Sequence, residues 1–188
     1  MELPPLDQLV RDLEEEFRGG ARGKRVAELL SAYSRSSEDW RPYCFFDGAK
    51  YTRNLVERND RFELLILGWG AGQESPIHNH EGQDCWMGVL SGEVEEVRYP
   101  APSQVRPGPL RPSERKVFER GDVAFIRDEI ALHLVRSGRP ANHAVSLHLY
   151  ASPYDECDCY CPDTGAVTRR KLIYFSVRGR ILVPEVSS

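Results

Sequence analysis

Apolar residues recur at helical spacing in two segments near the start of the chain. They stand at Leu6, Leu9, Val10, Leu13 and Phe17, and again at Val26, Leu29, Leu30 and Tyr33. Residues three or four apart share one face of a helix, so each segment is predicted to form a short amphipathic helix that packs on something larger. The intervening sequence RGGARGK, residues 18–24, is rich in glycine, which interrupts helices.

From about residue 51 the pattern changes to short β-rich runs separated by Gly, Pro, Asn and Asp. The runs are YTRNLVE, FELLILGWG, CWMGVLSGEVEEVRYP, RKVFERG, DVAFIR, ALHLVRS, AVSLHLYAS and KLIYFSVRG. Many closely spaced strands with no helix between them predict an antiparallel sandwich or barrel of the jelly-roll kind. The proline-rich segment 100–113 is predicted to be an exposed loop between two strands. We therefore predict a mainly β fold, with two or three short helices in residues 1–45 packed outside a barrel formed by residues 46–188.

The length and composition of the chain narrow the class of protein. With 188 residues, 40% of them apolar, the chain is long enough to bury one hydrophobic core but too short for two well-buried ones. Residues 1–188 are therefore predicted to form a single domain. The net charge is −4 with no basic stripe, which argues against a nucleic-acid partner. The chain also has no apolar run near the roughly 18 residues of a membrane span.

The N-terminus and the cysteines bear on the expected compartment. MELPPLDQLVRDLEEEF is acidic where a signal peptide would be basic and then apolar. Five scattered cysteines, an odd number, do not suggest a disulfide framework, so reduced thiols are expected. We expect a soluble, cytoplasmic protein without a membrane partner. It is expected to be a monomer, because no apolar stripe is left unexplained.

The stretch GQESPIHNHEGQDC contains the first candidate chemistry. On a strand, His78 and His80 would point to the same face and present two ligands to a divalent metal, although two surface histidines in a turn are the commoner meaning of such a pair. The flanking glycines give G-x5-H-x-H-x4-C-x6-G, and GDVAFIRDEIALH adds a glycine and His133. Together they resemble the two motifs of the cupin superfamily, jelly-roll barrels that hold a metal on three histidines and usually one glutamate.

The sequence departs from that pattern because Cys85 stands at the glutamate position. Three neutral imidazoles leave the 2+ charge of a metal uncompensated, which favours an anionic ligand from the substrate. His143 is the alternative third ligand, but it follows Pro140 in the polar turn SGRPANHAV and is expected to be solvated.

Two other strands carry polar residues at a spacing of two. In AVSLHLYAS, Ser146, His148 and Tyr150 share one face, which either lies in water or turns inward and supplies a hydrogen-bonded relay to a metal site. In YTRNLV, Tyr51 and Arg53 point together. An arginine in a strand is usually a surface residue, but a guanidinium that points inward can clamp a carboxylate.

These motifs resemble cysteine dioxygenases in order and spacing. The resemblance rests on YTRNLV, WG-x-G, HNH followed five residues later by Cys85, ALH and SLHLYASPYDEC, and it covers residues 51–157. It implies a cupin enzyme with one mononuclear non-haem Fe(II) per chain. Such an enzyme adds both atoms of O2 to the thiol of L-cysteine and forms cysteine sulfinic acid.

The resemblance also implies roles for individual residues. His78, His80 and His133 would bind iron, Arg53 would clamp the substrate carboxylate with Tyr51 beside it, and Tyr150 would hydrogen-bond near substrate and O2. His148, with Ser146 behind it, would orient the Tyr150 hydroxyl. Cys85 is expected to reach across the barrel and form a thioether crosslink with Tyr150, a protein-derived cofactor.

Residues around this set have weaker assignments. Trp69 and Met87 are placed around the site, although both also fit plain core packing, and Cys157 is placed near its mouth. CDCYC, residues 157–161, is weak support for a zinc site without a distant partner pair. Cys159 and Cys161 are expected to be exposed or packed in a loop, with a disulfide among the three cysteines left open.

Two other functions are also compatible with the sequence. One is oxidation of another small thiol such as 3-mercaptopropionate, although relatives with that preference tend to lack the arginine of YTRNLV. The other is a non-catalytic cupin that senses a ligand, because cupin folds host both kinds of protein.

Overall fold

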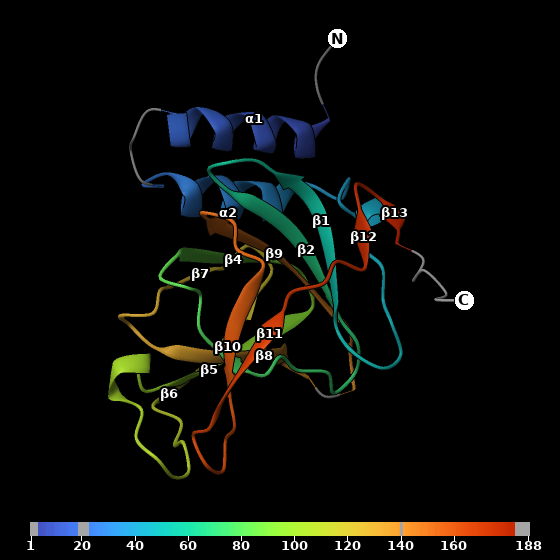
Figure 1. Cartoon of the computed structure of the whole chain (residues 1–188). Coiled ribbons are helices and arrows are strands. Elements are labelled where there is room, and N and C mark those ends of the chain that lie inside the picture. The colour runs from blue at the N-terminus through green and yellow to red at the C-terminus, as the bar shows by residue number, and fades with distance from the viewer. Residues whose placement is uncertain (1–3, 19–22, 140, 183–188) are drawn as a thin grey trace, which may run out of the picture.

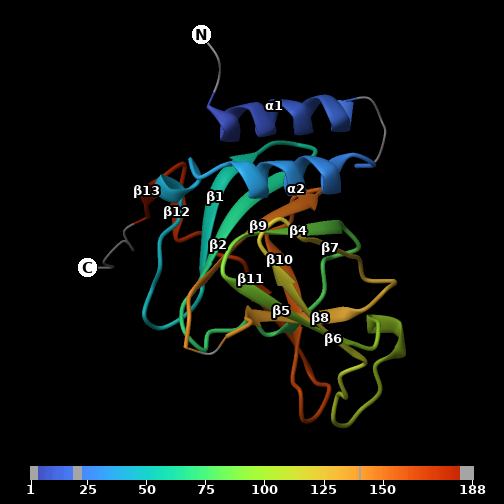
Figure 2. The same ribbon diagram turned by 180° about the vertical axis from the view of Figure 1, so that it is seen from behind.

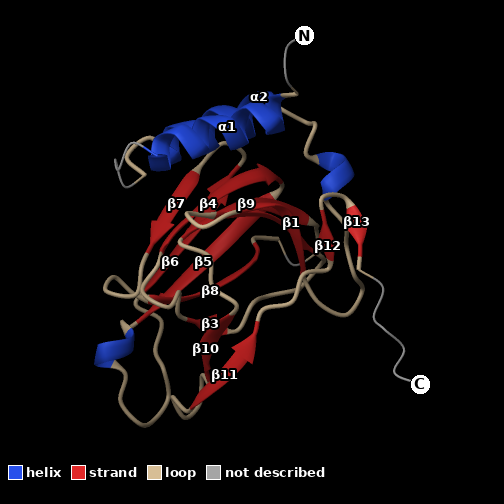
Figure 3. Cartoon of the chain, turned by 45° about the horizontal axis from the view of Figure 1, so that its top comes forward, coloured by secondary structure: helices blue, strands red, loops and turns tan. Residues whose placement is uncertain are grey.

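The computed structural model describes residues 4–18, 23–139 and 141–182, and both predicted helices are present in it. Helix α1 spans Pro5–Arg18 and α2 spans Val26–Ser36, followed by a 3-10 turn, η1, at Arg41–Tyr43. The two helices lie together against the outer face of one sheet (Figures 1 and 3). The glycine-rich residues 19–22 between them lie outside the described residues.

The strands form two sheets that face each other. The seven-stranded sheet has the order β13-β12-β1-β2-β9-β4-β7. Its strands are β1 (Thr52–Arg58), β2 (Glu63–Trp69), β4 (Asp84–Ser91), β7 (Val123–Ile126), β9 (Ala144–Ala151), β12 (Ser176–Val177) and β13 (Arg180–Ile181). It is antiparallel except for the pair of β1 and β12. This sheet carries the helices.

The six-stranded sheet has the order β11-β10-β3-β8-β5-β6. Its strands are β3 (Ile77–His78), β5 (Glu93–Tyr99), β6 (Glu114–Glu119), β8 (Leu132–Ser137), β10 (Glu156–Tyr160) and β11 (Val167–Lys171). Seen from behind, β5, β6 and β8 lie on the side of the barrel away from the helices (Figure 2). The predicted mainly β jelly roll is therefore confirmed, although within the described ranges no strand pairing closes the two sheets into one cylinder.

Strand β2 shows why the sequence of a strand in the seven-stranded sheet can be a continuous run of apolar residues. Leu64 and Ile66 pack with the helices, whereas Leu65 and Leu67 belong to the cluster in the barrel interior. Because both faces are covered, the period-two alternation of a half-exposed strand is lost. The polar residues that do point inward are therefore conspicuous.

Three predictions for the second half of the chain were wrong in part. The run KLIYFSVRG is not one strand, since β11 ends at Lys171 and β12 is only Ser176–Val177. Segment 100–113 does connect β5 to β6 and includes a 3-10 turn, η2, at Pro102–Gln104, but Ala101 and Leu110 are buried. Strand β10 (Glu156–Tyr160) includes the first four residues of CDCYC, and Cys159 in it is buried and not exposed.

Candidate active site

Three histidines meet inside the jelly roll. His78 ends β3, His80 lies two residues further on, and His133 is on β8 directly opposite His78 in the strand register. Their ligand atoms all lie within 4.8 Å of one another. The pairing of β3 with β8 therefore brings the two sequence motifs together at one point.

Each ring has an acceptor near its Nδ1 atom. The Nδ1 of His78 lies 2.9 Å from the Pro76 carbonyl oxygen, and the Nδ1 of His133 lies 2.8 Å from Glu96 Oε1. The Nδ1 of His80 is 3.6 Å from Asp128 Oδ1, which is close but beyond a hydrogen bond. In His78 and His133 the acceptor at Nδ1 holds the proton there and leaves the Nε2 lone pair free for a metal.

The burial and the unpaired nitrogen atoms of the histidines fit a bound cation. Burial and the neighbouring imidazole of His80 lower the pKa of His78 to about 3, and burial holds the pKa of His133 well below its ordinary value. Both ring nitrogens of His80 are buried without a hydrogen-bond partner among the described residues. Leaving such an atom unsatisfied costs about 1–3 kcal/mol. Three buried imidazoles, one of them with both ring nitrogens unpaired, fit a divalent transition metal such as Fe(II).

Two carboxylates behind the histidines were missed in the sequence. Glu96 is 1% exposed and is shared between His133 and the Nε of Arg98, which lies 2.9 Å from Glu96 Oε2. Asp128 accepts backbone N–H bonds from His80 and Gly82, each of 2.7 Å. The signal for Glu96 was its place on the same strand face as the buried Val94, where an acid needs a partner.

His143 is not part of this cluster. It is exposed in the turn before β9, and its ring stacks on Phe46 with 4.8 Å between centroids. The structure therefore places the alternative third ligand outside the barrel interior.

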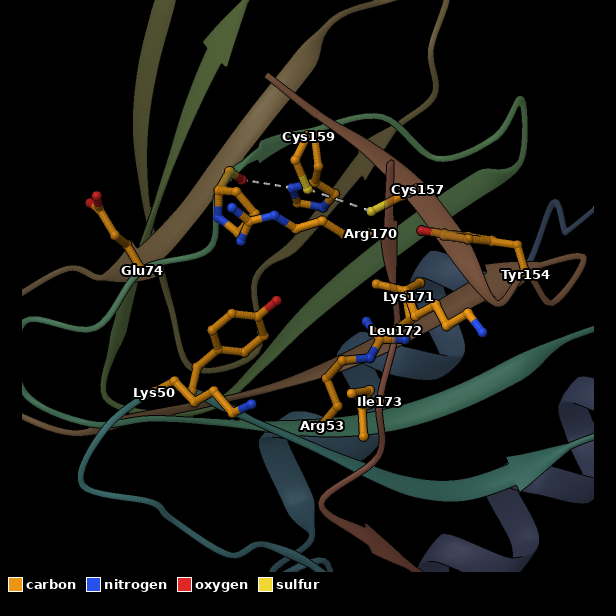
Figure 4. Close-up of a pocket in the computed structure, with 13 residues that line it drawn as sticks. Lys50, Arg53, Glu74, Tyr154, Cys157, Cys159, Arg170, Lys171, Leu172 and Ile173 are labelled. Carbon is orange, nitrogen blue, oxygen red and sulfur yellow. Dashed lines mark hydrogen bonds between the residues drawn. The ribbon is translucent and has the colours of Figure 1, made fainter. Parts of the chain in front are cut away.

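A pocket of about 290 Å³ opens beside the histidines (Figure 4). Its lining includes His78, Arg53, Tyr51, Tyr154, Cys157 and Cys159. Lys50, Arg170 and Lys171 are exposed at its rim. The pocket thus leads from a cationic mouth to the candidate metal centre.

Arg53 points inward from β1 and is 8% exposed. Its guanidinium carbon lies 5.6 Å from the centre of the Tyr150 ring, and Nη2 is 3.9 Å from Glu63 Oε1, too far for a hydrogen bond. In the described part of the chain, Nε and Nη2 have no hydrogen-bond acceptor. Unused donors on a buried cation are costly, so this side of the pocket is prepared for an anion.

A relay of four side chains starts at Trp69 on β2, runs along β9 and ends beside the histidines. Trp69 Nε1 donates to Ser146 Oγ over 2.8 Å, Ser146 Oγ lies 2.8 Å from His148 Nε2, and His148 Nδ1 lies 3.3 Å from the Tyr150 hydroxyl. The indole can only donate, so Ser146 Oγ accepts from it, and the directions of the other two contacts depend on the tautomer of His148. With the imidazole proton on Nδ1, Ser146 donates to Nε2, the Tyr150 oxygen accepts from Nδ1, and the Tyr150 hydrogen is free to donate into the site.

Burial keeps the end of this relay uncharged. It holds the pKa of His148 well below, and the pKa of Tyr150 well above, their ordinary values. Tyr51 stacks on Trp69, with 4.7 Å between ring centres and 19° between planes. The structure thus brings Tyr51 and Trp69 together behind the relay.

Cys85 and Tyr150 are neighbours within one sheet. They are directly paired across β4 and β9, a position where side chains of adjacent strands touch. The expectation that Cys85 reaches across the barrel is therefore wrong. Met87, two residues along β4, packs in the interior cluster with Val89 and is not among the residues that line the pocket.

A jelly roll with three histidines clustered in its interior is the arrangement of a cupin metal site. A solved Klebsiella pneumoniae structure, an uncharacterized conserved protein with a double-stranded beta-helix domain, has a TM-score of 0.50 and 15% identity, covering 72% of this chain and 90% of that one. At that identity the likeness shows the fold alone.

The family is shown by the sequence comparisons. The model of the family "Cysteine dioxygenase type I" matches residues 4–162. Cysteine dioxygenase type 1 of Rattus norvegicus is 36% identical over 93% of this chain and 88% of its own length, and that of Homo sapiens is 35% identical over 97% and 92%. That of Danio rerio is 32% identical over 97% and 92%. The chain belongs to the cysteine dioxygenase type I family, as the sequence motifs predicted.

None of the helices in the described residues is long and apolar enough to cross a membrane.

Proposed function

We propose that this chain oxidises the thiol of L-cysteine with O2 to cysteine sulfinic acid, using one Fe(II) held by His78, His80 and His133. The observation that carries the proposal is Arg53, a buried guanidinium with unused donors in the same pocket as His78, one of the three clustered histidines. A substrate that carries both a carboxylate and a thiolate would pair with the guanidinium through the first group and with the metal through the second. Membership of the family supports the reaction class.

Each side of the pocket would hold one part of the substrate. Arg53 would bind the carboxylate, and the three imidazoles favour an anionic sulfur because they leave the metal's charge uncompensated. When bound, Fe(II) supplies the redox chemistry and the open coordination positions that reaction with O2 requires. Tyr150, held by His148, would donate its hydroxyl hydrogen toward the reacting groups and orient them.

The substrate proposal predicts an order among three thiols. Oxygen uptake by the Fe(II)-loaded protein should be fastest with L-cysteine. Cysteamine has no carboxylate and leaves the buried Arg53 unpaired, which costs about 1–3 kcal/mol or roughly 5- to 150-fold in kcat/KM. If 3-mercaptopropionate were fastest, the alternative substrate would be correct. No uptake with any thiol would favour a non-catalytic sensor.

We also propose a thioether between Cys85 Sγ and a ring carbon of Tyr150. Their direct pairing on β4 and β9 supports this bond, because the two side chains are adjacent in the barrel. Its formation removes the thiol hydrogen and one ring hydrogen, and the two electrons go to O2.

The crosslink is expected to appear in intact mass as a loss of two hydrogens. Cys85→Gly should abolish this loss and retain some activity, whereas Cys161→Ser should leave the loss in place. A mass deficit that persists in Cys85→Gly would contradict the assignment.

A further inference from the structure

A buried carboxylate lies next to the guanidinium that is proposed to bind the substrate. Glu63 is the first residue of β2, is 0% exposed and pairs directly with Tyr150 of β9 in the strand register. Its Oε1 is 3.9 Å from Nη2 of Arg53, and its Oε2 has no hydrogen-bond partner in the described part of the chain. A buried cation and a buried anion therefore lie side by side without sharing a hydrogen bond.

A pair of this kind is expected to close into direct contact. Inside a protein a guanidinium and a carboxylate attract each other strongly, and a two-pronged pair with N–O distances of about 2.7–2.9 Å satisfies both groups. Here Nε and Nη2 of Arg53 are left without acceptors while Glu63 is within reach. Direct contact would use the donors that a substrate carboxylate needs, so Glu63 is a potential competitor of the substrate.

Tyr174 holds Glu63 from the other side. The Nη1 atom of Arg58 lies 2.6 Å from the Tyr174 hydroxyl oxygen and 2.7 Å from Asp155 Oδ1. A guanidinium can only donate, so the tyrosine oxygen accepts from Arg58 and its own hydrogen is donated to Glu63 Oε1. Burial and the neighbouring Glu63 raise the pKa of Tyr174 to about 12, so the hydroxyl keeps this hydrogen at neutral pH.

The backbone around Tyr174 is tied to the strand that carries Arg53. Tyr174 lies between β11 and β12, and the N–H of the next residue, Phe175, donates to the Arg53 carbonyl oxygen over 2.7 Å. The two residues before it, Leu172 and Ile173, line the same pocket as Arg53 (Figure 4). The segment therefore fixes where the tyrosine hydroxyl stands relative to both charges.

We propose that Tyr174 is a positioning residue that holds Glu63 apart from Arg53 and so keeps the guanidinium available for the carboxylate of the substrate. This role rests on the proposed function, in which Arg53 binds the carboxylate of L-cysteine. Tyr174 is not among the residues that line the pocket, so it acts through Glu63 and Arg53 and not by touching the substrate. Without its hydroxyl, Glu63 pairs with Arg53 and competes with the substrate.

The test is the dissociation constant of L-cysteine, measured by isothermal titration calorimetry on the Fe(II)-loaded protein in the absence of O2. Tyr174→Phe should raise this constant several-fold and leave that of cysteamine, which has no carboxylate, unchanged. Adding Glu63→Gln to Tyr174→Phe should restore the wild-type affinity, because an amide competes for a guanidinium much less well than a carboxylate. General damage to packing would weaken binding of both thiols and would not be rescued by a second substitution.

Tyr43→Phe is the matched control and should leave both constants unchanged, because Tyr43 packs against the core under the helices. Unchanged binding of L-cysteine in Tyr174→Phe would overturn the proposal. Weaker binding in Glu63→Gln alone would also overturn it, since Glu63 would then position Arg53 and not compete for it. Equal affinity of the wild-type protein for the two thiols would overturn the binding role of Arg53 and this role with it, whereas binding without later O2 uptake would overturn the dioxygenase proposal alone.

Discussion

Replacing Arg53 with alanine is expected to lower kcat/KM for L-cysteine by roughly a hundredfold, because losing the partner of a buried carboxylate costs about 3 kcal/mol. The guanidinium has no other hydrogen-bond acceptor among the described residues at Nε and Nη2, so its donors are free for the substrate. The same change should hardly affect cysteamine, which has no carboxylate to lose. Measuring kcat/KM for both thiols therefore separates binding of the carboxylate from general damage.

Two controls sharpen that result. Arg53→Lys keeps a charge but not the two-pronged geometry, so it should fall between wild type and Arg53→Ala. Arg136→Ala, at a surface arginine paired with Glu95, should leave kcat/KM unchanged. Iron content and Tm of each variant show whether the fold and the metal centre are intact. Unchanged kcat/KM for L-cysteine in Arg53→Ala would mean that the carboxylate does not bind there.

Replacing His133 with alanine should reduce bound iron from one per chain to a small fraction and abolish oxygen uptake. This ring is directly opposite His78 and is one of only three imidazoles in the described cluster. Iron per chain, measured after equilibration with Fe(II) and removal of free metal, tests the prediction directly.

The matched control is His143→Ala, which removes an exposed imidazole and should keep iron and activity. Glu96→Ala should give an intermediate result, with metal affinity lowered about 10- to 100-fold, because it removes the acceptor that orients His133 but leaves all three imidazoles in place. Full iron content in His133→Ala would contradict the three-histidine site.

The spacing of residues in the sequence was sufficient to predict those parts of the site that lie along one strand. The alternation in SLHLY placed Ser146, His148 and Tyr150 on one face, and the structure shows that this face turns inward. The alternation in YTRNLV placed Arg53 on one face with Tyr51, and the structure shows that Arg53 points inward.

Contacts between distant strands could not be predicted in the same way. Alternation determines which face a side chain occupies, but not which strand lies beside it or in which register. Cys85 and Tyr150 were therefore expected on opposite walls, although β4 and β9 are neighbours. Glu96 and Asp128 were missed for the same reason, since each supports a histidine from a segment more than thirty residues away. CDCYC was misjudged because its cysteines suggested a loop, whereas β3 and β11 make it a central strand.

The central claim is that this site places both oxygen atoms of O2 on the sulfur of L-cysteine. The most direct test supplies the Fe(II)-loaded protein with L-cysteine under ¹⁸O2 and analyses the product by mass spectrometry. We predict cysteine sulfinic acid in which both sulfinate oxygens carry the label. Product with one labelled oxygen, or cystine without sulfinate, would contradict the account.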